Sequence, residues 1–526
     1  MNRRELIQLA SASAALQATS RLAYSQTTLK DNPFKLGVAS GSPTPDGVVL
    51  WTKLVSDGMF GFSDKPVGVR WQVAHDETFT RIALQGTATA LPQLGHSVHV
   101  DLRGLQSDRW YFYRFIVGTG ASAMMSDVGR TRTAPAQNAR VDKLRFAFAS
   151  CQNWDHGFFA AYRQMVQDNP DLVVFLGDYI YEYASPKNPN ANLPRRHDIR
   201  TATTLADYRS LYALYKSDPL LQAAHRMCPW IVTWDDHEVE NDYASDRGAV
   251  LTTPEEFLTR RAAAYQAYYE HMPLPASALA RGLAGLGQND GVRVNQRVAW
   301  GSLAHFHVLD CRQYRDYQAC QKPNRGGSGM VKAADCAELQ DPNRSMLGKP
   351  QEVWLAEGMA LDGNAGKASQ PMPWSIIAQS TLLAKINSPA DKEPRIWTDG
   401  WEGYPFARQR LLASLQAQPS LHPVILSGDV HLNVVANVEN IATEFCGTSL
   451  TSQTNWHPER EPSFYQDNPH VQYFNSEKRG YGLCDITPKL WTTTLMGVDD
   501  VRSESSVTTP IAKFAVERGN KTPAKM

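Results

Sequence analysis

Short alternating runs fill the first part of the chain. Apolar and polar positions alternate in GVVLWTKL, VGVRWQVAHD, HSVHVDLRGL and RWYFYRFIVG, and turns rich in Gly, Pro and Asp separate these runs. Alternation with a period of two is typical of strands that bury one face of a sheet. We therefore expect residues 35–136 to form a small all-β sandwich of immunoglobulin or fibronectin type.

The pattern changes at Leu144, where continuous apolar runs begin. LRFAFASC, DLVVFLGD, PWIVTWDD, HFHVLDCR, WSIIAQS and HPVILSGD each end in polar residues, and helical stretches such as PEEFLTRRAAAYQAYYEH and PFARQRLLASLQAQ lie between them. Strands that are buried on both faces have this character. The order of strand, helix and strand predicts an α/β domain over residues 144–500, with its site at the strand ends.

The two ends of the chain differ from these parts. The first residues, MNRRELIQLASASAALQATSRLAYSQ, combine Arg3 and Arg4 with a weakly apolar stretch that is rich in Ala and Ser. This resembles a twin-arginine signal peptide over residues 1–25, which predicts export through the twin-arginine machinery to the periplasm or the exterior. The segment is too short and too mild to span a bilayer, and no other segment is a transmembrane candidate. Residues 501–526 are polar and rich in Ser, Thr and Lys, and we expect a C-terminal tail there.

Composition narrows the class of protein. The 526 residues include 53 Lys and Arg against 53 Asp and Glu, so the formal net charge is zero, which argues against nucleic-acid binding through a basic surface. The seven cysteines are an odd number, so in an exported protein at least one thiol stays free or binds a metal. Cys320 and Cys336 flank a Gly-rich loop and could form a disulfide, although the sequence does not fix the pairing.

Polar residues at four strand ends carry the candidate chemistry. Each end taken alone is more often a turn, a helix cap or a hydrogen-bonded core residue than a ligand. Together, however, they bring several acidic and metal-competent groups to neighbouring positions, and burying these without cations would be costly. The residues are Cys151 in ASCQN, Asp178 and Tyr181 in GDYIY, Asp235, Asp236, His237 and Asn241 in TWDDHEVEN, and Asp429 and His431 in SGDVH.

The types of these side chains suggest which metals they would hold. A thiolate, a phenolate, an imidazole and carboxylate oxygens together favour ferric iron, which keeps a tyrosine ligand deprotonated. A neighbouring set of Asp and Asn oxygens suits a hard divalent ion such as calcium, magnesium or manganese. Asp178 has two carboxylate oxygens and could therefore bridge two metals.

The motifs as a group resemble the PhoD-like alkaline phosphatase family, a branch of the metallophosphoesterase superfamily. The stretches that carry the resemblance are ASCQN, FLGDYIYEY, TWDDHEVEND, VLDCRQYRD, WSIIAQS, DGWEGYPFARQRLL, ILSGDVHLN and EFCGTSLTS, and it extends over roughly residues 35–500. The resemblance implies a four-layer α/β/β/α domain behind a small all-β sandwich. It also implies Fe3+ beside Ca2+, with Mn2+, Mg2+ or Zn2+ as substitutes.

Roles for individual residues follow from the resemblance. Iron would be held by Cys151, Asp178, Tyr181 and His431. Calcium would be held by Asp178, Asp429 and one or more of Asp235, Asp236 and Asn241. The wider superfamily has Asp-x-His at the first strand end and Asn-His-Glu at the third, whereas this chain has CQN and DHE. These departures agree with the PhoD branch, in which Tyr181 replaces the missing histidine ligand.

The expected reaction is hydrolysis of phosphate esters by a hydroxide that two metals generate from bound water. His237 would protonate the leaving group, or else orient a ligand through a hydrogen bond. Arg312 would bind phosphate, or else form a surface salt bridge. We expect an exported phosphatase that acts on small phosphomonoesters and diesters. The alternatives are a phosphodiesterase of phospholipase D type, acting on phospholipid headgroups, and a non-catalytic secreted binding protein with the same fold.

Overall fold

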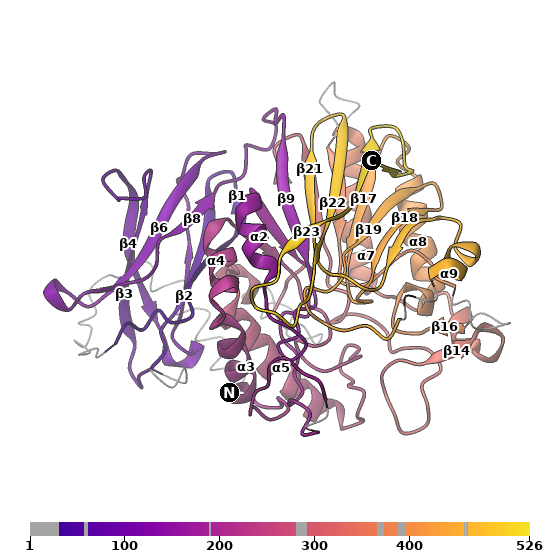
Figure 1. The fold of residues 1–526 in the computed structure, drawn as a ribbon, viewed down its shortest axis with the longest axis horizontal. Coiled ribbons are helices and arrows are strands. Elements are labelled where there is room, and N and C mark those ends of the chain that lie inside the picture. Colours follow the sequence, from indigo (N-terminus) through magenta and orange to yellow (C-terminus); the bar gives the residue numbers. More distant parts are fainter. Residues whose placement is uncertain are drawn as a thin grey trace.

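The computed structural model describes residues 31–56, 62–188, 191–279, 292–365, 373–387, 395–456, 458 and 461–526. The predicted signal peptide, residues 1–25, lies outside these ranges. Figure 1 shows an all-β part at one end of the molecule, in indigo and purple, beside a larger part built from sheets and helices. No helix in the described ranges is long and apolar enough to cross a bilayer.

The all-β part is a sandwich of two layers, as the alternating pattern predicts. One layer contains β1 (Val38–Thr44), β2 (Gly47–Lys53) and β5 (Ser97–Asp101). The other contains β3 (Val67–Ala74), β4 (Ile82–Ala90), β6 (Trp110–Val117), β7 (Met124–Met125) and β8 (Gly129–Arg132). Side chains from both layers meet in one core, with Leu50 and Val100 from the first layer and Val69 and Phe115 from the second.

The sandwich is continuous with the larger part of the molecule. β1 pairs in parallel with β11 (Trp230–Val232), where Gly41 lies opposite Trp230. A buried ion pair of 3.2 Å also joins Lys53 on β2 to Glu270 on α5 (Pro254–His271). One ten-stranded sheet therefore runs through both parts, in the order β24-β23-β22-β21-β9-β10-β11-β1-β2-β5.

Two central sheets pack face to face in the larger part. In the ten-stranded sheet, β9 (Leu144–Ala149), β10 (Leu172–Phe175) and β11 are parallel, and β21 (Arg479–Ile486) and β22 (Leu490–Val498) continue it in antiparallel fashion. The rings of Phe146 and Phe306, one from each sheet, meet edge to face at 5.3 Å. The second sheet has the order β12-β13-β15-β17-β19-β18-β20. Its strands are β12 (Gln296–Trp300), β13 (Ala304–Val308), β15 (Trp374–Ala378), β17 (Pro423–Ser427), β18 (Asn433–Val438), β19 (Ala442–Cys446) and β20 (Val471–Asn475).

Helices cover the outer face of each sheet. On the ten-stranded sheet these are α2 (Ala161–Asp168), α3 (Leu205–Lys216), α4 (Pro219–Met227) and α5. On the seven-stranded sheet they are α7 (Lys349–Ala365), α8 (Pro405–Gln416) and α9 (Glu461–Asp467). A small two-stranded antiparallel sheet of β14 (Met330–Lys332) and β16 (Arg395–Trp397) lies near one end of the second sheet (Figure 1). The predicted four-layer α/β/β/α fold behind an all-β sandwich is confirmed.

The sequence sets the start of two of these helices directly. Thr204 and Asp207 form a reciprocal capping box before α3, and Thr253 and Glu256 do the same before α5. Each box satisfies backbone N–H groups that the first helical turn leaves without partners. Pro254 occupies the first turn of α5, where a missing N–H has no cost.

The expectation of a polar C-terminal tail is wrong. Residues Thr508–Glu517 form β23, which pairs with β22, and β24 (Ala524–Lys525) pairs with β23. Ala512, Phe514 and Val516 alternate along β23 and enter the core between the two sheets. The overall polar composition of residues 501–526 conceals this alternation, which extends the α/β part of the chain well past residue 500.

Candidate metal centre

Loops after four strands carry the candidate ligands. Cys151 follows β9, Asp178 follows β10, Asp235 follows β11 and Asp429 follows β17. The first three strands are parallel neighbours, so their carboxyl ends lie side by side, and β17 brings its end from the other sheet. The site is therefore assembled where the ends of both central sheets meet.

The backbone turns sharply at these positions. Cys151, Asp178, Asp429 and His431 have φ values of 58°, 55°, 66° and 55°, in the left-handed region that residues other than glycine rarely adopt. Each such residue costs of order 1 kcal/mol or more, so the surrounding structure must enforce it. Gly177 has φ 105°, and a Cβ there would lie 2.5 Å from the backbone nitrogen of Asp235. The glycine before Asp178 thus allows the ends of β10 and β11 to touch.

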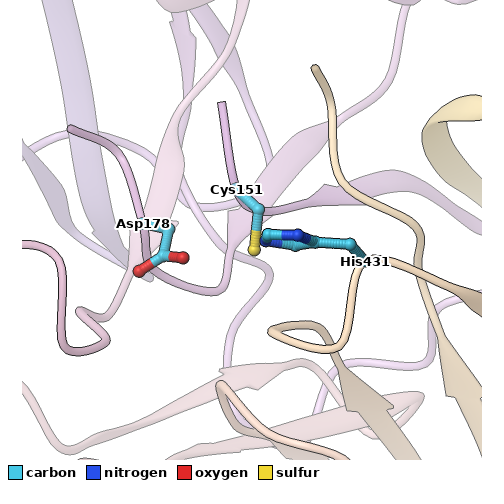
Figure 2. A group of neighbouring side chains, drawn as sticks. All are labelled: Cys151, Asp178 and His431. Carbon is cyan, nitrogen blue, oxygen red and sulfur yellow. The ribbon is translucent and has the colours of Figure 1, made fainter. Parts of the chain in front are cut away.

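The four predicted iron ligands converge. The side chains of Cys151, Asp178 and His431 each offer one ligand atom, and these atoms lie within 4.8 Å of one another. Figure 2 shows the three side chains pointing toward a common centre. The Tyr181 hydroxyl donates to Asp178 Oδ2 at 3.0 Å and lies 3.2 Å from His431 Nε2. Residues from three separate loops therefore surround one position.

His431 is held in the form that a metal ligand requires. Its Nδ1 lies 2.6 Å from the backbone carbonyl oxygen of Gln453, which fixes the proton on Nδ1. Desolvation lowers the pKa of His431 to about 3, so the ring stays neutral. Its Nε2 lone pair then faces the group of ligands, as the tautomer of a metal-binding histidine requires.

A second group shares Asp178 with the first. Ligand atoms of Asp178, Asp236 and His237 lie within 4.8 Å of one another, and so do those of Asp236, Asp242 and Asp399. Asp429 accepts a hydrogen bond of 2.7 Å from Thr381 Oγ1, and Asp235 Oδ2 is buried without a hydrogen bond from any described residue. Asn241 is exposed, and its backbone N–H donates to Glu182. Its role as a ligand stays a prediction.

Three carboxylates of the site resist ionisation unless a bound cation is present. Burial raises the pKa of Asp178 and of Asp429 well above the usual range, and together with neighbouring carboxylates it raises the pKa of Asp235 to about 6. Burial also raises the pKa of the Cys151 thiol and of the Tyr181 phenol. Bound cations reverse such shifts by stabilising the anionic forms. The donor set therefore fits two cations that share Asp178.

Comparison with known proteins agrees with this geometry. Residues 146–495 match the PhoD-like phosphatase family, and residues 17–135 match the N-terminal domain of PhoD-like phosphatases. Alkaline phosphatase D of Bacillus subtilis is 39% identical over 543 residues, covering 98% of this chain and 88% of that protein.

The chain belongs to the PhoD-like phosphatase family. The expected family and the expected enzyme class, a phosphoric ester hydrolase, are thus confirmed. A solved structure of PhoD superposes with a TM-score of 0.85 at 39% identity, covering 95% of this chain and 93% of that one. A purple acid phosphatase from yellow lupin superposes with a TM-score of 0.54 at 10% identity, covering 91% of this chain and 74% of that one, and shares the fold.

His237 faces the centre of this phosphatase from the side of the second group. Its Nδ1 lies 2.7 Å from Glu182 Oε2, and its ring lies 4.2 Å from that of Tyr181. Burial opposes a charge on this ring, but the carboxylates of Glu182, Asp178 and Asp236 outweigh it and raise the pKa of His237 well above its ordinary value. With Nδ1 engaged, Nε2 is the atom left to carry a proton toward a substrate or to bind a cation.

Arg312 lies inside the phosphatase rather than on its surface. Its guanidinium pairs with Asp235 and also lies 3.5 Å from Asp236 and 2.7 Å from Asp399. With a side chain only 1% exposed, the alternative of a surface salt bridge is wrong. The guanidinium offsets the charge of three buried carboxylates, and its predicted contact with phosphate stays a prediction.

Four acidic residues of the site lie outside the set predicted from the sequence, namely Glu182, Glu238, Asp242 and Asp399. Glu238 accepts backbone N–H groups of Asp178 at 3.0 Å, Tyr179 at 2.5 Å and Asp235 at 2.7 Å, which ties the ends of β10 and β11 together. Glu182 pairs with His237, and Asp399 pairs with Arg312. Glu182 and Glu238 do stand within the family motifs, but their partners are visible only in the fold.

The possible disulfide is also present. Cys320 and Cys336 are bridged, and the other five cysteines are free and buried. Of these five, only Cys151 belongs to one of the groups of ligand atoms found among the described residues. Cys151 is thus the free cysteine, among the described residues, that is placed to bind a metal.

Proposed function

We propose that this PhoD-like phosphatase is an exported enzyme that hydrolyses phosphomonoesters and phosphodiesters with two metal ions. The observation that supports the proposal best is the sharing of Asp178 by two groups of buried ligand atoms. Because a carboxylate has two oxygens, Asp178 could contribute to both positions of a two-metal site.

The chemistry of the ligands supports different metals in the two positions. Cys151, Asp178, Tyr181 and His431 suit Fe3+, because thiolate and phenolate ligands favour a small ion of high charge. Asp178, Asp429 and one or more of Asp235, Asp236 and Asn241 suit Ca2+, which prefers oxygen ligands. Mn2+, Mg2+ or Zn2+ could substitute, since supply as well as ligand type governs occupancy.

The protein's own residues would orient the reaction. Two bound cations supply Lewis acidity toward a phosphoryl oxygen and toward water. Glu182 holds His237 through Nδ1, so that Nε2 can deliver a proton to the leaving oxygen of the ester. Thr381 fixes the orientation of Asp429, and Glu238 fixes the separation between Asp178 and Asp235. Positioning and charge stabilisation thus account for most of the protein's contribution.

The proposed substrates and location rest on two further observations. The Bacillus subtilis relative is named alkaline phosphatase D, which supports small phosphate esters as substrates here. The Arg-Arg pair before an Ala- and Ser-rich stretch supports twin-arginine export to the periplasm or beyond. Export of an already folded protein would suit a chain that receives its metals before it crosses the membrane.

A combined metal and substrate analysis tests this function. Protein isolated after export would be analysed for iron and calcium, then assayed with p-nitrophenyl phosphate, bis(p-nitrophenyl) phosphate and phosphatidylcholine. We expect both metals and hydrolysis of the first two compounds. Hydrolysis of phosphatidylcholine alone would instead indicate an enzyme of phospholipase D type. Full metal occupancy without hydrolysis of any of the three would indicate a binding protein.

A further inference from the structure

Arg479 lies directly behind the proposed iron ligands. It is the first residue of β21, and its side chain is almost fully buried, with 6% of the residue exposed. Its Nη1 donates to the backbone carbonyl of His431 at 2.5 Å, to Ser449 Oγ at 3.1 Å and to the carbonyl of Ser452 at 3.3 Å. Its Nη2 donates to the carbonyl of Ser476. One guanidinium thus joins the loop of His431 to the loop of residues 449–452.

The loop of residues 449–452 touches the other ligands. Ser452 Oγ donates to the Tyr181 hydroxyl oxygen at 2.6 Å and lies 2.8 Å from the backbone carbonyl of Cys151. The backbone N–H of Ser452 donates to the same carbonyl at 3.3 Å. Ser452 therefore links Arg479 to Cys151 and Tyr181, whereas Arg479 bonds the backbone of His431 directly.

The charge of Arg479 has no carboxylate partner among the described residues. Its four acceptors are three carbonyl oxygens and one hydroxyl, all of them neutral. A buried charge without an opposite charge is costly. The hydrogen bonds to these four acceptors therefore hold the guanidinium in place between the two loops.

We propose that Arg479 is a positioning residue for the metal centre, because its guanidinium joins the loop of His431 to the loop of residues 449–452, which contacts Cys151 and Tyr181. The proposal rests on the proposed two-metal function. Partners that orient metal ligands in this way typically change metal affinity about 10- to 100-fold when they are replaced. The hydrogen bonds of Arg479 go to three backbone carbonyls and to Ser449, so we expect its effect to reach activity through the metals.

Metal retention in two variants and a control tests this role. Arg479→Gln removes the charge, and Arg479→Lys keeps the charge but loses the paired donors. Arg518→Gln is the control. The Arg518 guanidinium is also half-buried and also donates to a backbone carbonyl, that of Pro488, but it stacks on Trp374, away from the ligands. Each purified protein would be exposed to a chelator. Iron release would be followed over time, together with the visible absorption band expected of iron bound to a tyrosinate.

We expect iron to leave Arg479→Gln about 10- to 100-fold faster than wild type, with a shifted band. The rate of iron release from Arg479→Lys should lie between those of wild type and Arg479→Gln. If Arg479→Gln does not fold, the comparison of Arg479→Lys with wild type tests the proposal. Arg518→Gln should release iron at the wild-type rate. Equal release from wild type and both Arg479 variants, or release from Arg518→Gln as fast as from Arg479→Gln, would overturn the inference alone. A wild-type protein without metal would overturn the two-metal function and this inference with it.

Discussion

Tyr181 donates its phenolic hydrogen to Asp178, the residue three positions earlier, over 3.0 Å. This contact brings the Tyr181 oxygen to the carboxylate that both groups of ligand atoms share. A bound cation would take the place of that hydrogen, because both oxygens would then serve as anionic ligands. The contact supports the proposal that Tyr181 is an iron ligand, which would give the centre a visible absorption band.

Tyr181→Phe should therefore abolish or greatly weaken the visible charge-transfer band expected of iron and tyrosinate. The substitution removes a single oxygen, so we expect the fold to persist. Tyr183→Phe is the matched control, since Tyr183 lies next to Tyr181 but binds Asn153 instead of a ligand, and it should keep the band. Absorption spectra of the iron-loaded wild-type, Tyr181→Phe and Tyr183→Phe proteins test this prediction. An unchanged band in Tyr181→Phe would exclude Tyr181 as a ligand.

His237→Gln should lower kcat by about 100- to 10,000-fold while iron and calcium stay bound, because the variant loses the group that would protonate the leaving oxygen. The loss should be larger for an alkyl phosphate than for p-nitrophenyl phosphate, whose leaving group needs less protonation. Glu182→Gln should show the same dependence on the leaving group to a smaller extent. Loss of metal in His237→Gln, with equal losses for both substrates, would identify His237 as a ligand instead.

Chelation should destabilise the protein more at pH 7.5 than at pH 4. The pKa of Asp235 is raised to about 6, and those of Asp178 and Asp429 are also raised. As the pH rises from the unfolded pKa of about 4, the unfolded chain loses these protons first, so the folded metal-free protein loses relative stability. The raised pKa of His237 acts in the same direction, because its stabilising charge is lost as the pH rises through the folded pKa.

Thermal unfolding with and without chelator at several pH values measures this effect. We expect the difference in Tm between the metal-bound and metal-free proteins to increase from pH 4 toward pH 7.5. Asp235→Asn removes one of the responsible carboxylates and should reduce that increase. A difference in Tm that stays constant with pH would contradict the prediction.

Arg312→Met should lower the free energy of unfolding by about 3–5 kcal/mol, since it removes the guanidinium that pairs with the buried Asp235 and Asp236. Asp399 would keep its second partner, Arg315, at 3.3 Å. Arg103→Met is the surface control, because the Arg103 side chain is 53% exposed and pairs with Asp46 and Asp101. That change should cost about 1 kcal/mol or less. Urea unfolding of both variants gives the comparison, and similar losses would argue against a charge-balancing role for Arg312.

Phe514→Ala should cost about 3–5 kcal/mol, as expected for a large aromatic side chain in a core. Lys513→Ala, on the exposed face of the same strand, should change stability by about 0.5 kcal/mol or less. Urea unfolding of both variants measures these changes in the free energy of unfolding. A small effect of Phe514→Ala would show that β23 contributes little to the core between the sheets.

The sequence predicts the fold class and the meeting of the main ligands for a clear physical reason. The parallel neighbours β9 and β10 bring their carboxyl ends together, so the polar residues after them lie near one another. The packing of the two sheets brings the residues after β17 to the same place. Cys151, Asp178 and His431 accordingly form one group. The strand β23 is missed by the prediction from the sequence. Its alternating apolar residues lie in a segment that is polar on average, and the prediction rests on that average composition instead of on the alternation.

Other features depend on contacts between distant segments, which one sequence does not reveal. Arg312 pairs with Asp399 and Asp235, residues far apart along the chain. Arg479 donates to backbone carbonyl oxygens, which every residue has, so the sequence does not indicate these partners. Glu238 likewise acts on backbone N–H groups. Such partners can be found only once the loops are placed in space.

The pairing of β1 with β11 at Gly41 and Trp230 has a consequence for dissection of the protein. Removing residues 31–136 would take away the strand that pairs with β11 and turn β11 into an edge of the sheet. Exposed sheet edges can pair with strands of other molecules and lead to aggregation. The all-β part thus covers an edge of the catalytic sheet, and we expect a truncated protein to aggregate more readily than the full chain.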